Sequence, residues 1–116
     1  MPVIKRAAIH TSESEPGRQR LTLVNAALGS GHLDMGELAI GPNVKGPLHL
    51  HPAHEEAIYI LEGPLDYILG NEDGTVNTGD VILAPAGVKH QIINSSSESK
   101  RIMFIFPTTN VQRVLL

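Results

Sequence analysis

The stretch GDVILAPAGVKHQIIN, from Gly79 to Asn94, is the part of the sequence that decides the fold. Two runs rich in Val, Ile and Leu, 81–83 and 88–93, lie on either side of the turn residues Pro85-Ala86-Gly87. Short runs of this kind, bounded by turn residues, are typical of β-strands. The stretch therefore predicts two strands joined at a turn, with His90 on the second strand.

Similar runs continue on both sides of this stretch, separated by many of the eleven glycines and eight prolines of the chain. They cover residues 21–24, 38–40, 58–61, 65–69 and 102–106. Turn residues suited to hairpins stand at Gly63-Pro64, at 71–74 and at Gly79-Asp80. Only residues 109–116 leave room for a short helix. The pattern predicts an all-β protein, an antiparallel sandwich or barrel.

The chain of 116 residues has the length of one domain. We expect a single domain over residues 1–116, with a core barrel at about 20–107. Residues 5–20 mix charge with Ser, Pro and Gly, and they suit a loop, an edge strand or an exchanged arm. The tail 111–116 ends on apolar residues, which we expect to cover exposed apolar surface on the outside of the barrel. With the apolar strand 101–106, this arm and tail are the expected contacts of a homodimer.

The composition excludes several classes of protein. Nine Lys and Arg against 12 Asp and Glu give a formal net charge of −3, and aromatic residues make up 3%. The chain therefore lacks the basic and stacking surfaces of nucleic-acid-binding proteins. The longest apolar run, 102–106, is too short to span a membrane, and the first residues do not resemble a signal peptide, so we expect a cytoplasmic location. Without cysteine there is no disulfide, thiolate zinc site or cysteine nucleophile.

Six histidines without a cysteine are the unusual part of this composition. His49 and His51 are two residues apart, so their side chains point to the same face of an extended chain. A carboxylate, Glu55 or Glu56, follows beyond a bend, and His90 lies on a separate strand. Because both faces of the strand after the bend carry apolar residues, alternation does not choose between the two glutamates. If the strands are neighbours, three imidazoles and one carboxylate converge.

Such a cluster would hold one divalent transition metal ion. Imidazole and carboxylate groups suit Fe, Mn, Ni, Co, Cu and Zn, and the sequence does not select among them. Four ligands on an octahedral ion leave two positions for substrate, water or dioxygen. One carboxylate against a divalent ion leaves a charge of about +1, which favours a small, anionic, chelating molecule such as an enolate or a hydroxy acid.

The two histidine-bearing segments resemble the two sequence motifs of the cupin family. The motif G-x5-P-x-G-x2-H-x3-N matches at every fixed position: Gly79, Pro85, Gly87, His90 and Asn94. The motif G-x5-H-x-H-x(3,4)-E-x6-G matches at His49, His51, Glu56 and Gly63. Asn43 stands in place of its leading glycine, and Asn tolerates the left-handed backbone that such a turn requires.

This resemblance implies an antiparallel double-stranded β-helix, the jelly-roll barrel of a small single-domain cupin. It implies His49, His51, Glu56 and His90 as the metal ligands, because the spacing to Gly63 selects Glu56 over Glu55. For Asn94 a structural role is expected. His54 falls on the bend and is expected to face solvent, while His10 and His32 match no motif and are expected at the surface.

Three functions remain open, because cupins perform many reactions. The first is a dioxygenase-type metalloenzyme acting on a small enolate or hydroxy/keto acid. The second is a non-redox isomerase, lyase or cyclase acting on a sugar acid or polyketide, with Glu56 as the catalytic group that moves a proton. The third is a module that binds or senses a small molecule without turnover.

The lining of the barrel should distinguish these functions. An enzyme for sugar acids needs a cation near the metal, but the available cations are all expected on the surface: Arg18, Arg20, Lys45 and Lys89. An apolar lining would suit a dioxygenase, and its expected members are Met35, Ile58, Ile60, Ile68, Ile92, Met103 and Phe104. Tyr59 and Tyr67 are expected to pack in the core. On this basis the dioxygenase is placed first.

Overall fold

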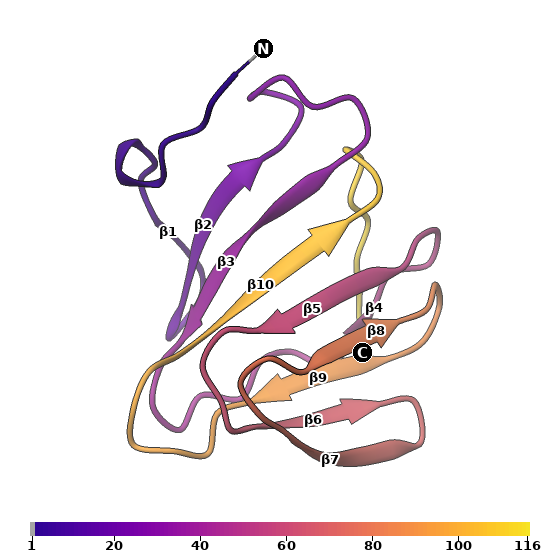
Figure 1. The fold of residues 1–116 in the computed structure, drawn as a ribbon. Helices are drawn as coiled ribbons and strands as arrows, with labels where there is room; N and C mark the ends of the chain where they lie inside the picture. Colours follow the sequence, from indigo (N-terminus) through magenta and orange to yellow (C-terminus); the bar gives the residue numbers. More distant parts are fainter. Residues whose placement is uncertain (1) are drawn as a thin grey trace.

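Eleven short β-strands build the structure, a computed structural model that describes residues 2–116 (Figure 1). They are β1 (Ser12–Glu15), β2 (Arg18–Val24), β3 (Asp34–Ile40), β4 (His49–Leu50), β5 (Glu56–Ile60), β6 (Leu65–Leu69), β7 (Glu72–Val76), β8 (Val81–Ala84), β9 (His90–Ile93), β10 (Lys100–Phe106) and β11 (Val114–Leu115). A single 3-10 turn, η1 (Arg6–Ala8), precedes them. Among the described residues no helix is long and apolar enough to cross a membrane.

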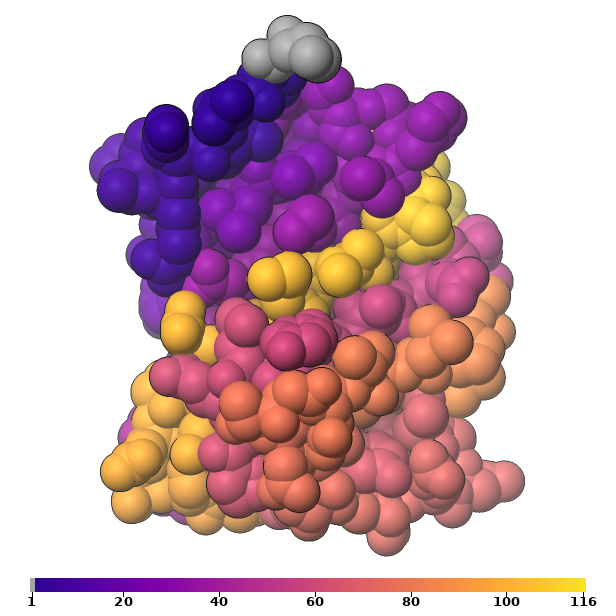
Figure 2. Space-filling view, in the orientation of Figure 1, coloured from indigo at the N-terminus to yellow at the C-terminus, as the bar shows by residue number. Residues whose placement is uncertain are grey.

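The strands form two antiparallel sheets that face one another. The first has the order β1-β2-β3-β10-β5-β8 and the second the order β11-β4-β9-β6-β7. In Figure 2, β10 near the C-terminus forms a yellow band between the N-terminal strands and the pink and orange strands β5 and β8. Segments far apart in sequence are therefore neighbours, and the predicted all-β jelly-roll architecture is confirmed.

The core lies between the inner faces of the two sheets. Alternation along β5 shows the pattern: Glu56, Ile58 and Ile60 are buried, whereas Tyr59 between them is exposed. The same alternation in β10 buries Ile102, Phe104 and Phe106. The central cluster comprises Leu38, Ile40, Ile58, Ile60, Leu65, Ile82, Ile92, Ile102, Phe104 and Phe106. Because side chains in a strand alternate between faces, β5 delivers Glu56 to the same interior as these residues.

Two asparagines hold the connections beside the barrel. Asn43 has a φ of 56°, so it adopts the left-handed backbone expected where the motif has glycine. The fully buried Asn94 donates its side-chain amide to the carbonyls of Ile40, Gly41 and Glu98 at 2.7–3.0 Å. This is the structural role expected for Asn94, since it ties the end of β9 to the end of β3.

Three sequence-based expectations of local structure are corrected, and one open choice is decided. Residues 109–116 contain no helix, because β11 instead supplies the edge that pairs with β4. Residues 72–74 belong to β7 rather than to a turn, since the chain already reverses at Gly70, where φ is 59°. Tyr59 points outward from β5 and does not pack in the core. Of the three options for residues 5–20, the edge strand is observed, as β1 pairs with β2 of the same chain.

Candidate metal centre

Three strand ends bring the predicted ligands together. His49 on β4 pairs directly with His90 on β9, and His51 follows β4 by one residue. Glu56 begins β5 in the opposite sheet. One atom from each of these four residues lies within 4.8 Å of the others, so the cluster could hold one metal ion.

The glutamate lies between two of the histidines. Glu56 Oε1 is 2.9 Å from His90 Nε2 and 3.2 Å from His51 Nε2. The imidazole rings of His49 and His90 are also close, with centroids 4.3 Å apart. His51, Glu56 and His90 are buried, whereas His49 is half-buried. The arrangement leaves His49 as the member of the cluster nearest to solvent.

Backbone carbonyls orient all three imidazoles in the same way. His49 Nδ1 lies 2.9 Å from the carbonyl of Pro47, His90 Nδ1 lies 3.0 Å from that of Val88, and His51 Nδ1 lies 2.7 Å from that of Gln112. Each carbonyl can only accept, so each Nδ1 carries the hydrogen and each Nε2 faces the cluster. Histidines that bind metals are commonly held by such hydrogen bonds from their other ring nitrogen. The donor set therefore fits a divalent transition metal.

Burial and hydrogen bonding also set the charge of the cluster. Burial lowers the pKa of His49 to about 4, which keeps this imidazole neutral at neutral pH. Burial by itself would raise the pKa of Glu56, but its hydrogen-bond contacts with His51 and His90 lower it to about 2. Burial likewise opposes the charged form of His90, yet its hydrogen bonds to Glu56 and the Val88 carbonyl raise its pKa. Glu56 is therefore ionised at neutral pH, and its negative charge favours a bound cation.

The remaining acidic and histidine candidates lie outside the cluster. Glu55 is exposed on the outer side, so the structure places Glu56 and not Glu55 among the histidines. His10 and His32 are exposed, as expected. His54 is buried rather than solvent-facing, because its ring packs against those of His51 and Phe106 and its Nε2 accepts a hydrogen bond from the Gln112 amide. It is a neighbour of the cluster rather than a member.

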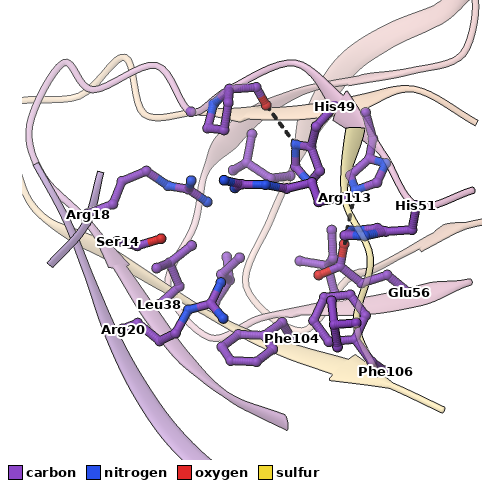
Figure 3. A pocket seen from close by; sticks show the side chains of 17 residues that line it. Ser14, Arg18, Arg20, Leu38, His49, His51, Glu56, Phe104, Phe106 and Arg113 are labelled. Atoms are coloured by element: carbon purple, nitrogen blue, oxygen red, sulfur yellow. Dashed lines mark hydrogen bonds and ion pairs between the residues drawn. The ribbon is translucent and has the colours of Figure 1, made fainter. Parts of the chain in front are cut away.

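The cluster lies at one end of a cavity of about 440 Å³, a size suited to a small organic molecule (Figure 3). One part of the wall is apolar and consists of Leu38, Ile58, Ile92, Ile102, Phe104, Phe106 and Val111. Three of the expected lining residues, Ile58, Ile92 and Phe104, are among them. Met35, Ile60, Ile68 and Met103 do not line this cavity.

Arginine side chains form the other part of the wall, and this corrects the sequence-based expectation. Arg18 and Arg20 of β2 and Arg113 of the tail line the cavity, with Arg18 only 7% exposed. Lys45 and Lys89 are exposed, as expected. Leu21 lies between the inward-facing positions of β2 and is buried on the other side of the strand. A pattern that places Leu21 in the core predicts that Arg18 and Arg20 face solvent. The signal that could have shown otherwise is their i, i+2 spacing, which puts both on one face of the strand, as it does for His49 and His51.

Comparison with known proteins agrees with this site and fold. The family model described as "Cupin domain" matches residues 36–106, which is more than half of the sequence. The chain therefore belongs to the cupin family. The match includes both histidine-bearing segments and all four residues of the cluster.

The individual proteins that resemble this chain are 25–30% identical to it, and their names describe different activities. The polyketide synthase CurC of Streptomyces cyaneus is 26% identical over 111 residues, covering 90% of this chain and 71% of that protein. Quercetin 2,3-dioxygenase of Bacillus subtilis is 30% identical over 91 residues, covering 76% of this chain and 26% of that protein. The structure of the polyketide cyclase RemF from Streptomyces resistomycificus superposes with a TM-score of 0.81 and 25% identity, covering 100% of this chain and 87% of that one.

Proposed function

We propose that this cupin is a metal-dependent enzyme that performs a non-redox proton transfer on a small, anionic, oxygen-chelating substrate. Cyclisation of a polyketide, or isomerisation or elimination on a sugar acid, belongs to this reaction class. The observation that carries the proposal is the mixed cavity wall, in which three arginines face the four-residue cluster. A purely apolar substrate would leave these charges unused, whereas an anionic one would satisfy them.

The proposed ligands are His49, His51, Glu56 and His90. A divalent ion bound there would act as a Lewis acid that polarises a carbonyl or hydroxyl oxygen. The chain itself supplies the proton acceptor: Glu56 uses Oε1 for its histidine contacts, and its Oε2 makes no hydrogen bond among the described residues. Glu56 Oε2 can therefore take a proton from a carbon held beside it, and the apolar wall excludes the water that would compete.

A second candidate is a dioxygenase, and two observations favour it. The apolar half of the wall suits an aromatic substrate, and quercetin 2,3-dioxygenase is among the relatives. We place it second because the match covers 26% of that enzyme, whereas the match to the polyketide synthase CurC covers 71% of that protein.

One pair of measurements separates the two candidates. Metal-loaded protein is mixed in D2O with 2,4-dioxovalerate, an enolisable diketone that carries a carboxylate, and exchange of its C3 protons is followed by NMR. Oxygen uptake is measured in parallel with quercetin. We expect faster proton exchange than with metal-free protein or with a His51→Ala variant, and no oxygen uptake. Uptake without accelerated exchange would favour the dioxygenase, and neither effect would contradict both candidates.

We also propose that the protein is a homodimer. Tyr59, Val81 and Leu83 expose apolar side chains on the outer face of β5 and β8, and the tail residues Leu115 and Leu116 are exposed as well. Clusters of exposed apolar side chains commonly mark an interaction surface. Sizing with light scattering should give twice the chain mass, and a Val81→Glu variant should reduce it. A monomer at micromolar concentration would contradict this proposal.

A further inference from the structure

The cavity has a second polar end, away from the metal ligands. Figure 3 shows Arg18 and Arg20 on the side of the cavity opposite His51 and Glu56. Arg113 starts beside His51, and its side chain extends across the cavity towards Arg18. Arg18 and Arg20 come from β2, and Glu56 comes from β5, with β3 and β10 between these strands in the sheet. A single small ion cannot contact both ends, so a molecule that uses both must extend along the cavity.

Arg20 is the least satisfied of these cations. Its guanidinium lies over the ring of Phe104, 4.8 Å from the centroid, and it forms no ion pair or hydrogen bond among the described residues. Its Nε is buried without a hydrogen-bond partner. Arg20 is half-buried, and a buried nitrogen without a hydrogen-bond partner carries a desolvation cost that a bound ligand could remove.

The neighbouring arginines share one carboxylate. Glu15 accepts a hydrogen bond from Arg18 Nη1 at 2.7 Å and another from Arg113 Nη1 at 2.8 Å. Arg18 is buried, its Nε also lacks a partner, and its Nη2 makes no hydrogen bond among the described residues. Burial raises the pKa of Asp34, and the nearby charge of Arg20 opposes this shift, but the two residues form no ion pair. Glu15 pairs with two of the three arginines, and Asp34 contributes a second negative charge nearby without pairing. The region therefore has a net charge of about +1, and Arg20 is left without an ion-pair partner.

We propose that Arg20, supported by Arg18 and Arg113, binds a carboxylate of the substrate while the opposite end of the same molecule chelates the metal. This inference rests on the proposed function and narrows it to substrates with a carboxylate remote from the reacting oxygens. A carboxylate suits this end because a guanidinium binds its two oxygens in a planar, bidentate manner. It also supplies the single negative charge that the region lacks, and it would give Arg20 the partner that the protein does not provide.

The first experiment tests this end of the cavity without a metal. Metal-free protein is titrated with benzoate, and the Nε–H resonances of its arginines are followed by NMR. The Arg20 resonance should shift with a saturable dependence on benzoate, and methyl benzoate, which has the same shape without the charge, should produce no shift. Inorganic phosphate is titrated separately. A lack of saturation with benzoate, or tighter binding of phosphate than of benzoate, would overturn the carboxylate assignment.

The second experiment tests both ends together. Zn²⁺-loaded protein is titrated by calorimetry with 3,4-dihydroxybenzoate and with its methyl ester, which chelate through the same two hydroxyl groups. The acid should bind at least about tenfold more tightly, because only it can form charge-assisted hydrogen bonds with the arginines. The preference should disappear in Arg20→Gln, with the ester's affinity unchanged. It should persist in Arg101→Gln, which removes an arginine that is paired with Glu37 and Glu62 and does not line the cavity.

The outcomes separate this inference from the proposed function. Equal affinity of the acid and the ester for protein that retains Zn²⁺ would overturn the carboxylate site and leave the metal site standing. Saturable benzoate shifts in a protein that binds no metal would support the carboxylate site and contradict the proposed function. If Arg20→Gln does not fold, Arg20→Lys replaces it; this variant keeps the charge but not the bidentate fork and should lose most of the preference.

Discussion

The two ends of the cavity are built in opposite ways. At the metal end, every imidazole is held by a backbone carbonyl and the glutamate contacts two histidines. At the arginine end, Arg20 has no hydrogen-bond partner, and two arginines share Glu15. The metal end is thus preorganised by the protein alone, whereas the arginine end still needs a negatively charged group. This difference is what the proposed function requires: a candidate metal site held rigidly by the protein, and a far end that a bound carboxylate would complete.

The largest expected effect is the loss of metal affinity when one of the proposed ligands is removed. His51→Ala removes both the donor and the contact with Glu56, so metal affinity should fall by more than about 100-fold, the upper range for a change in a supporting residue alone. Elemental analysis of untagged protein measures the retained metal. His32→Ala, which alters an exposed histidine, is the matched control and should retain the wild-type content. Equal metal content in the two variants would contradict the assignment.

Removal of the tail should lower metal affinity although it removes none of the four proposed ligands, because the tail contacts His51 and pairs with the strand of His49. Deletion of residues 111–116 eliminates the Gln112 carbonyl that orients His51 at 2.7 Å, so metal affinity should fall by about 10- to 100-fold. Gln112→Ala keeps the carbonyl and should bind metal normally, which separates a backbone effect from a side-chain effect. Competition with a chromogenic chelator measures both. Unchanged affinity in the deletion, with the fold verified by circular dichroism, would contradict this role.

Lower pH should weaken metal binding, because protons compete with the metal for the histidine nitrogens. The raised pKa of His90 means that a proton occupies its Nε2 already above the ordinary value, whereas His49 stays neutral until its pKa of about 4. Metal affinity should therefore fall as pH decreases, by about tenfold per pH unit below the pKa of His90 as one proton is displaced. The same chelator competition between pH 8 and pH 5 tests this. A flat profile would show that His90 is not a ligand.

The smallest expected effect concerns the arginine end. Arg20→Met removes an unpartnered cation and keeps an unbranched side chain, so metal-free protein should gain about 1 kcal/mol in unfolding free energy. Urea denaturation measures this change. Arg101→Met, which breaks ion pairs with Glu37 and Glu62, should not stabilise the protein. A destabilised Arg20→Met would indicate that Arg20 supports the fold rather than a ligand.

The cluster of His49, His51, Glu56 and His90 was largely predictable from sequence, because its signals are side-chain identities at fixed spacings. His49 and His51 share a face by strand geometry, and the strand assignments placed His90 on its own element. The choice of Glu56 over Glu55 came from the resemblance to cupins, and the structure supplies the physical reason by burying only Glu56.

The arginine end and the support from the tail were not predictable, for two physical reasons. Leu21 has the opposite parity to Arg18 and Arg20 on β2, so only one of the two sets can face the interior. Alternation of apolar and polar residues predicts that Leu21 does. The arginines face inward instead because the barrel interior contains a cavity that they line. The contact to His51 comes from a main-chain carbonyl 61 positions away. Every residue type carries such a carbonyl, so the identity of residue 112 gives no signal from which the contact could be predicted.

The use of main-chain carbonyls at Pro47, Val88 and Gln112 has a consequence for how this protein can change over evolutionary time. A substitution at any of these three positions leaves the carbonyl in place, so the orientation of the imidazoles is insulated from most point mutations there. The arginine end consists of side chains, and a single codon change can replace each of them. The orientation of the histidine cluster can thus persist while the residues at the other end of the cavity change.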